Sequence, residues 1–231
     1  MRRIVSLGTA LGLAALTLMA ASWPPAADGQ AYSVSQRTPP IEGFILGGFS
    51  PTAGAAASYL QDGWILDGGF IYWLAHGDMF GLRTDLGYSE HQATSQFQSF
   101  GALASGQRVN DGWGSFTSFS SGLMIRAPAT HWPRVYGLAQ IGVTNTHVRL
   151  VQTFYVPGYY CDPFFYYCSF PVVGYASVYS HTVNRFSWNL GIGLDFPTRG
   201  IPGWFLELQY RRVDTAPRTF EYWPVMVGVR F

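Results

Sequence analysis

Residues 221–231 read EYWPVMVGVRF, and the pattern of this stretch indicates the fold class of the chain. Counted back from the last residue, every second position is large and apolar: Trp223, Val225, Val227, Val229 and Phe231. A period of two is the pattern of a β-strand with one apolar face. Chain ends are usually polar and frayed, so an apolar strand that runs to the last residue needs a specific reason.

The same alternation recurs upstream, most clearly in TVNRFSWNLGIGLDF, residues 182–196. One parity there carries large apolar side chains, and the other carries Arg185, Asn189, Asp195 and glycines. WFLELQYRR (204–212) repeats the pattern. A soluble β-sandwich with a polar face in water is one interpretation. Bulky apolar residues along one whole face, opposite glycines and charges of both signs, fit a crowded polar interior better.

Composition excludes two broad classes of protein. Charged residues make up 12% of the 231 residues and aromatic residues 17%, whereas disordered chains are rich in charge and poor in aromatic rings. The formal net charge is +1, which is too small for a basic nucleic-acid-binding protein. We therefore expect an ordered protein with no nucleic-acid partner.

The first residues have the pattern of a targeting segment. Residues 1–3 are positive at Arg2 and Arg3, residues 4–21 are uncharged and apolar, and small residues follow at 20–22. This pattern predicts a signal peptide over 1–22, with cleavage as late as 31. A single membrane-spanning helix is the alternative, because the run is long enough to cross a bilayer. The prolines that follow, in place of a charged stop, favour the signal peptide.

Alternating segments and turn residues predict eight strands whose connections alternate between short and long. The longer loops fall near 53–61, 93–112 and 153–179, and the fourth, at 215–218, is short. This arrangement predicts an all-β fold, a closed antiparallel eight-stranded transmembrane up-and-down β-barrel. An extra hairpin at 154–156 and 172–179 would make ten strands. The expected strands are 41–52, 62–75, 78–92, 113–127, 133–152, 180–197, 202–214 and 219–231.

An even number of strands places both ends of the barrel sequence on the short-turn side, which is the periplasm. We therefore expect a periplasmic segment over 23–40, a barrel over 41–231, a location in the bacterial outer membrane, and outer-membrane lipid as a partner. Aromatic residues near strand ends predict two girdles at the headgroups, although ordinary core aromatics would look similar. They are Trp64, Tyr72, Trp73, Tyr88, Trp113, Trp132, Tyr136, Trp204, Tyr210, Tyr222 and Trp223.

These features together resemble the small outer-membrane β-barrels of the OmpA and OmpX type, the outer membrane protein β-barrel domain family. The resemblance covers about 31–231 and rests on the signal peptide, the eight strands and the final VGVRF. In that family the alternating last strand ending in Phe is the signal that the barrel assembly machinery recognises. The resemblance implies this role for Trp223, Val225, Val227, Val229 and Phe231, and implies the assembly machinery as a partner.

Polar residues on the inward parity predict a network inside the barrel. An eight-stranded barrel is just wide enough for side chains to fill, and buried charges must pair. The network then acts either as a structural plug of ion pairs or as a gated polar path. The plug predicts a structural or surface-interaction role, and the path predicts a porin-like channel for small solutes. The residues expected in the network are Arg83, Asp85, Arg185, Asp195, Glu207 and Arg211.

The longest loop carries both cysteines, in GYYCDPFFYYCSFP (158–171). Cys161 and Cys168 form an even pair in an exported protein, which predicts a disulfide. Their spacing is not CxxC and no His lies beside them, so we expect no metal. The tyrosines and phenylalanines around them either form an external contact surface within 153–179 or fold onto the barrel rim.

An enzymatic site is the least favoured interpretation. Ser180 and His181 with Glu207 or Asp214 would supply a nucleophile, a base and an acid. The chain lacks the His-x-Ser motif of outer-membrane lipid A deacylases, and it has no glycine-rich phosphate loop. We therefore expect no enzymatic activity and no cofactor, and we keep a lipid-modifying enzyme as the third hypothesis.

Overall fold

The structure is a computed structural model that describes residues 41–74, 79–128, 133–156, 160–162, 167–169, 172–196, 203–215 and 219–231. Within residues 155–173 only backbone is described. The predicted signal peptide (1–22) and the segment 23–40 lie outside the described residues. In the part of the chain that is described, no helix is both long and apolar enough to cross a membrane.

Strands dominate the described chain, as the alternation predicts. Two short helical elements accompany them, the 3-10 helix η1 (Gly54–Ser58) and the α-helix α2 (Ser95–Ser105). The strands are β1 (Ile41–Ser50), β2 (Thr52–Ala53), β3 (Leu60–Trp73), β4 (Phe80–Ala93), β5 (Asp111–Arg126), β6 (Arg134–Val156), β7 (Tyr160–Asp162), β8 (Tyr167–Ser169), β9 (Val172–Phe196), β10 (Gly203–Val213), β11 (Phe220–Tyr222) and β12 (Val225–Arg230).

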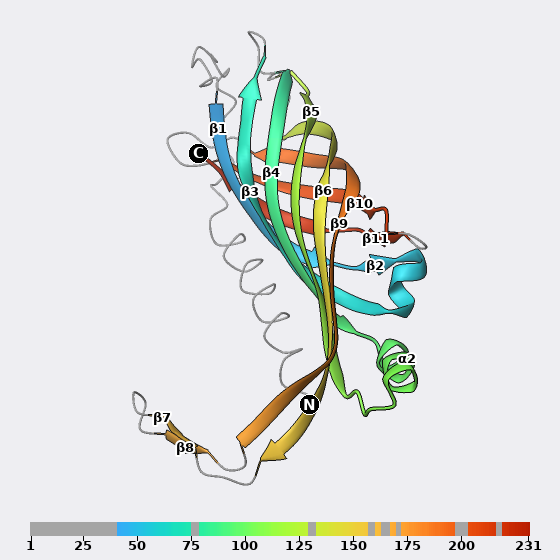
Figure 1. The fold of residues 1–231 in the computed structure, drawn as a ribbon. Helices are drawn as coiled ribbons and strands as arrows, with labels where there is room; N and C mark the ends of the chain where they lie inside the picture. The colour runs from blue at the N-terminus through green and yellow to red at the C-terminus, as the bar shows by residue number, and fades with distance from the viewer. Residues whose placement is uncertain are drawn as a thin grey trace. The chain divides into compact units, whose positions relative to one another are not determined.

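Eight of these strands form one antiparallel ring. The order is β1, β3, β4, β5, β6, β9, β10 and β12, and β12 pairs back onto β1. Figure 1 shows the strands curving from β1 round to the orange and red strands at the end of the chain. All eight predicted strands are present, and the prediction of an all-β antiparallel fold is confirmed.

The additional strand-like residues do not widen the ring. β6 and β9 pair along their whole length, from Arg134↔Asp195 to Val156↔Val172, whereas β5 follows β6 only as far as Val151. Residues 152–156 and 172–176 therefore lengthen an existing hairpin, and the ten-strand alternative is wrong for the described ring. We call this two-stranded extension the hairpin arm, and Figure 1 shows it projecting beyond the other strands.

Two prolines interrupt the closing strands without changing their register. Pro51 separates β1 from β2, and the neighbouring strand is interrupted at Trp223 and Pro224. The Trp223 N–H donates to the Pro51 carbonyl (2.9 Å), and the Gln209 N–H donates to the Pro224 carbonyl (3.0 Å). Pro224 lies between β11 and β12, away from both ends of the closing strand. The missing donor is tolerated there because its carbonyl still pairs.

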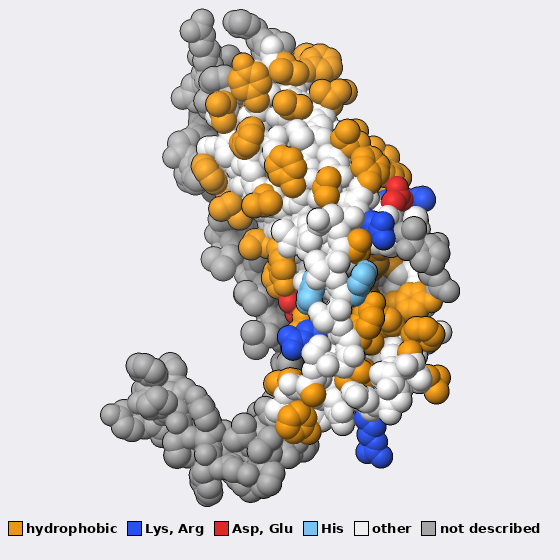
Figure 2. Space-filling view, viewed as in Figure 1, with side chains coloured by type: hydrophobic (Ala, Val, Ile, Leu, Met, Phe, Trp, Pro, Cys, Tyr) orange, Lys and Arg blue, Asp and Glu red, His pale blue; other side chains and the backbone are white. Residues whose placement is uncertain are grey.

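Side chains alternate between the inside and the outside of the ring, except at the register shift between Leu150 and Val151, where both are buried. The inward parity holds the charges of the two ion clusters described below, and the outward parity is exposed and apolar over much of each strand. Figure 2 shows hydrophobic side chains spread over the upper part of the visible face, whereas lower down His and Arg side chains lie among polar and further hydrophobic ones. The exposed apolar residues include Ile41, Ile45, Phe49, Leu66, Phe70, Leu82, Leu86, Phe119, Leu123, Ile125, Val135, Ile141, Val143, Phe186, Leu190, Ile192, Leu206, Leu208, Val225 and Val229.

The ring has two distinct ends. We call the end where β1 begins and β12 finishes the terminal end, and the opposite end, which carries η1 and α2, the loop end. Three of the aromatics predicted for the girdles point inward: Trp73, Tyr136 and Tyr222 are only 6%, 3% and 1% exposed. The prediction was wrong for these three, because closeness to a strand end does not determine parity. Trp132 lies outside the described residues.

Helix α2 occupies part of the segment that was predicted to be a loop, 93–112. Thr94 caps it: the Thr94 hydroxyl accepts a hydrogen bond from the Phe97 N–H (3.2 Å). Gly106 ends it in the left-handed conformation (φ 68°), where its N–H donates to the Ala102 carbonyl. Both capping residues are visible in the sequence, so this local signal was available and missed.

Gly122 and Gly137 provide a test of a close contact between two strands of the ring. A Cβ on Gly122 would lie 2.0 Å from the Ala139 carbonyl oxygen, whereas a Cβ on Gly137 meets nothing closer than 3.8 Å. We expect Gly122→Ala to lower the free energy of unfolding by about 1–3 kcal/mol, because the clash is with backbone. Gly137→Ala should change it by less than about 0.5 kcal/mol. Urea unfolding measures both, and equal values would contradict the close approach of β5 to β6 at Gly122.

Candidate functional site

The ring encloses a buried ion network at its centre, with Arg83 as its hub. The Arg83 Nε donates to Asp85 Oδ1 (2.9 Å), and its two terminal nitrogens face the two carboxylate oxygens of Glu207. The Tyr136 hydroxyl also donates to Glu207 (2.6 Å). The guanidinium carbon lies 4.3 Å from the centre of the Phe44 ring. Arg83 therefore joins β4 to β10 across the interior.

A second arginine extends this network toward the loop end. Arg211 donates to both oxygens of Asp67, and its Nε donates to Gln209 Oε1 (2.6 Å). The Gln209 amide in turn donates to Glu207. Glu207 and Gln209 are 0% exposed, so no water replaces these bonds. Hydrogen bonds are strong where solvent is excluded, and the network is expected to be rigid.

Two amide side chains and a serine form a polar wall on β5, β6 and β9, beside the central ion network. Asn189 donates to Gln140 Oε1 (3.1 Å) and to the Ser120 hydroxyl (3.2 Å). All three residues are buried, and they come from β9, β6 and β5. The polar wall and the ion network together occupy the middle of the ring.

A separate ion cluster closes the terminal end. Asp195 contacts three arginines: Arg126 (3.3 Å), Arg134 (3.2 Å) and Arg230. Glu42 is 3.2 Å from Arg230, and the Arg126 guanidinium lies 4.0 Å from the centre of the Trp73 ring. Residues from β1, β5, β6, β9 and β12 thus meet at one point.

The two clusters balance each other in charge. Two arginines face three carboxylates at the centre, and three arginines face two carboxylates at the terminal end. The sum is five positive and five negative groups. Charges that are removed from water need opposite charges beside them, and this interior supplies them internally.

An aromatic layer lies between the central network and the loop end. Phe116 and Phe220 stack with their centroids 4.3 Å apart. The His91 ring packs edge-on against Phe116, Phe220 and Tyr222, at 5.6, 5.5 and 5.8 Å. The His91 Nδ1 is 3.1 Å from the Gln61 carbonyl. This layer was not predicted from the sequence, because Tyr222 was assigned to a girdle and neither Phe116 nor Phe220 was singled out.

The structure brings together most of the predicted network, but in two places. Arg83, Asp85, Glu207 and Arg211 are in the central network, and Asp195 is in the terminal cluster. Arg185 joins neither of them. It points inward near the loop end, as its parity predicts, but no described carboxylate forms an ion pair with it. Glu42, Arg126 and Arg134 belong to the terminal cluster and were not predicted. All three are on the inward parity of their strands, and this pattern would have identified them.

The acids and the histidine considered for an enzymatic site have other contacts. Glu207 is held by Arg83 and Tyr136 at the centre, whereas Asp214 is 3.2 Å from Arg212 at the surface. His181 packs beside Tyr179, with ring centroids 6.3 Å apart. In the described residues, no group of three or more His, Cys, Asp or Glu side chains could hold a metal ion.

Two further predictions fall at the chain's end and in its longest loop. Trp223, Val225, Val229 and Phe231 are exposed on the outward parity, and Val227 is half-buried there, as predicted. Their role in assembly stays a prediction. The backbone places Cys161 opposite Cys168 in the β7–β8 pair, but their side chains lie outside the described residues, so the disulfide also stays a prediction.

No protein-family model and no curated protein matches the chain. Among solved structures, it is similar to Ail, the attachment invasion locus protein of Yersinia pestis, in complex with the heparin analogue sucrose octasulfate. The TM-score is 0.46 at 12% identity, over 83% of this chain and 99% of that one. For Neisserial surface protein A the TM-score is 0.48 at 7% identity, over 83% and 96%. For the N-terminal β-barrel domain of Pseudomonas aeruginosa OprF it is 0.38 at 13% identity, over 82% and 97%.

Glu207 allows the strength of the central network to be measured. Glu207→Leu leaves Arg83 buried beside Asp85 alone, and we expect it to lower the free energy of unfolding by about 3–5 kcal/mol. Asp214→Leu, which breaks an exposed ion pair, should cost less than about 1 kcal/mol. The double variant Arg83→Met with Glu207→Leu should recover part of the loss. Urea unfolding followed by tryptophan fluorescence measures all three, and equal costs for the two single variants would contradict the network.

Proposed function

We propose that the chain is an eight-stranded transmembrane β-barrel of the bacterial outer membrane, similar to the small OmpA and OmpX barrels, with a structural or surface-interaction role. One observation carries the proposal. The ring is apolar outside and charged inside, and the ten charges of its two ion clusters are balanced. A bilayer demands an apolar exterior and a sheet without free edges, and a closed ring satisfies both demands.

The length of the exposed apolar band supports this assignment. On β3 the outward parity is aromatic or aliphatic from Trp64 to Leu74, apart from Gly68, which matches the ~9–11 residues of a tilted membrane strand. Outward aromatic rings also cluster on the loop side of the band. Tyr210 lies between Trp188 and Trp223, at 5.3 and 4.8 Å. Trp and Tyr favour the headgroup region, so this cluster suits a membrane interface.

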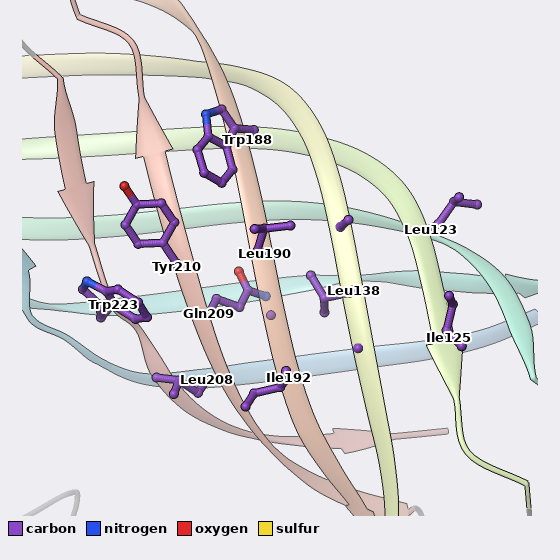
Figure 3. Close-up of a pocket in the computed structure, with 13 residues that line it drawn as sticks. Leu123, Ile125, Leu138, Trp188, Leu190, Ile192, Leu208, Gln209, Tyr210 and Trp223 are labelled. Carbon is purple, nitrogen blue, oxygen red and sulfur yellow. The ribbon is translucent and has the colours of Figure 1, made fainter.

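An apolar groove of about 740 Å³ on the outward surface supports contact with lipid chains. Figure 3 shows its labelled residues on neighbouring strands, with Leu123 and Ile125 on β5 and Leu190 and Ile192 on β9. The small residue Gly137 lies between these two strands and leaves the groove open. Acyl chains of outer-membrane lipid fit such a surface, because it exposes almost no polar atoms.

The loop end is the part that we assign to the cell surface, with the terminal end in the periplasm. Phe154, Tyr175 and Tyr179 on and next to the hairpin arm are 43%, 60% and 47% exposed. Exposed aromatic rings are favoured in protein interfaces. They support a role for 153–179 in binding an external partner, with the barrel as the membrane anchor and without enzymatic activity.

The alternative role, a small-solute channel, is less well supported. A conducting path would have to cross the stacked pair Phe116 and Phe220, and then the bonds between Arg83, Glu207 and Arg211. These groups are buried and bonded to one another. Desolvated groups that already satisfy each other offer little to a passing solute.

Planar-bilayer recording tests the plugged interior. We expect the wild-type protein to give no steady discrete currents, because the central network fills the ring. Arg83→Ala with Glu207→Ala removes the pair that crosses the interior and should produce openings. A shift in gel mobility on heating would verify that the variant is folded. Steady currents from the wild type would contradict the plug and favour the channel.

Phe231 tests the proposed recognition by the barrel assembly machinery. The Phe231 backbone exchanges two hydrogen bonds with Gly43, both 2.9 Å, and its side chain is 66% exposed. Phe231→Ser keeps the backbone bonds, so the refolded variant should unfold at nearly the same urea concentration as the wild type. In cells we expect much less heat-shiftable protein in the outer-membrane fraction. Val143→Thr, an exposed outward position on β6 outside the proposed signal, is the matched control and should assemble normally. Normal assembly of Phe231→Ser would refute the proposed signal.

A further inference from the structure

A small cavity of about 230 Å³ lies inside the ring at the loop end. Its lining includes the stacked aromatics Phe116 and Phe220, and Val148 and Val183 from the facing strands β6 and β9. Ala56 of η1 and Phe97 of α2 also line it. The cavity therefore stands on the aromatic layer and is bordered by the two helical elements of the loop end.

Arg185 is the charged residue of this cavity, and its environment differs from that of the other interior arginines. Its Nε is buried and has no hydrogen-bond partner. No described carboxylate lies within the 4.0 Å that defines an ion pair. Arg83, Arg211 and Arg230 each have acidic partners. A half-buried guanidinium without an anion costs folding free energy.

A second polar group in the cavity is also unsatisfied. The Thr146 hydroxyl is buried without a hydrogen-bond partner, on the strand next to Arg185. The register pairs Thr146 with Val183 and Arg185 with Thr144, so the two side chains are diagonal neighbours on the inward face. Buried polar groups are nearly always paired, and two such groups in one cavity indicate a missing partner that carries oxygen.

The other residues that line the cavity indicate the shape and polarity of the part of the ligand that does not carry the oxygen. Apart from Thr146, His181, Arg185 and two threonines at the rim, the lining residues are apolar or aromatic. Aromatic rings such as those of Phe116 and Phe220 pack well against another ring. The volume is below the ~300–1,000 Å³ of pockets for drug-sized ligands, so the occupant is small.

We propose that this cavity binds a small aromatic carboxylate, such as benzoate, from the external side. The carboxylate pairs with Arg185 and accepts a hydrogen bond from Thr146, and the ring packs on the Phe116 and Phe220 side. Arg is suited to this task because its planar guanidinium matches a carboxylate. The aromatic layer and the ion network lie beneath the cavity, so the ligand is held at the mouth and does not pass through. This site goes beyond a structural or surface role, and it does not require conduction.

Isothermal titration of the refolded protein with benzoate tests the site. We expect saturable binding with one benzoate per chain. Benzyl alcohol, which has the same ring without the charge, should bind about tenfold more weakly or worse, because a charged hydrogen bond is lost. Inorganic phosphate supplies the charge without the ring and should also bind more weakly.

Two substitutions locate the binding. Arg185→Gln should weaken benzoate binding about tenfold or more, with no loss of stability, because it removes an unpaired charge. Val183→Phe fills the cavity without altering its charge and should also abolish binding. Arg212→Gln, at the loop end of β10, is the matched control, since Arg212 is paired with Asp214 and Glu221 at the surface, and it should leave affinity unchanged.

The outcomes decide the proposal. Saturable benzoate binding that is lost in Arg185→Gln and Val183→Phe, and retained in Arg212→Gln, supports it. No saturable binding to the wild type, unchanged affinity in Arg185→Gln, or phosphate binding as tight as benzoate would overturn it. The heat shift in gel mobility, measured on every variant, verifies folding. Because bilayer recording reports on the plug alone, a failure of this site and a failure of the plug are distinguishable.

Discussion

The pairing of β12 with both β1 and β10 is the interaction on which the rest of the structure depends. It joins the last strand to the first and turns a row of seven hairpin-linked strands into a ring. Only a ring leaves no free edge, and only then can a sheet expose an apolar face to lipid without orphaned backbone groups. The closing strands carry Pro51 and Pro224, which remove two donors, yet the register on both sides is continuous. The carbonyls of these prolines keep the seam paired, so closure tolerates residues that would weaken the middle of an open sheet.

Closure of the ring directs alternate side chains of each strand into the interior. Charged side chains placed there lose contact with bulk water and need oppositely charged partners. Every second residue of each strand must enter a space without water. Two ion clusters hold five arginines and five carboxylates there: a central network with one excess negative charge and a terminal cluster with one excess positive charge. Each cluster draws its members from several strands. Arg83 alone reaches from β4 to Glu207 on β10. The pairs therefore act as cross-links through the interior, which makes this network a better plug than a path.

The alternation predicted the strands, their number and the side that each side chain faces, because a period of two is a local property. It could not predict height along the ring axis, which depends on strand tilt and register between distant segments. Arg185 and Arg211 share the inward parity, but one lies beside Thr144 and the other beside Asp67. Trp73 and Tyr136 were assigned to a girdle because only their closeness to strand ends was considered and their inward parity was not. Helix α2 was missed for a different reason: its capping residues, Thr94 and Gly106, were present, but the segment was judged by its lack of alternation.

Arg185 shows that the two ends of the interior differ in how their charges are paired. Toward the terminal end the charges of the chain are matched by other charges of the chain. In the cavity at the loop end, the Arg185 Nε and the Thr146 hydroxyl are buried without a hydrogen-bond partner, above the stacked Phe116 and Phe220. A chain that needed only a plug could place an apolar residue at 185, as it does at Val183, and would gain stability. The unpaired charge of Arg185 makes physical sense if its partner is a ligand from outside. The aromatic layer and the central network lie beneath the cavity, so such a ligand would enter, bind and leave through the loop end.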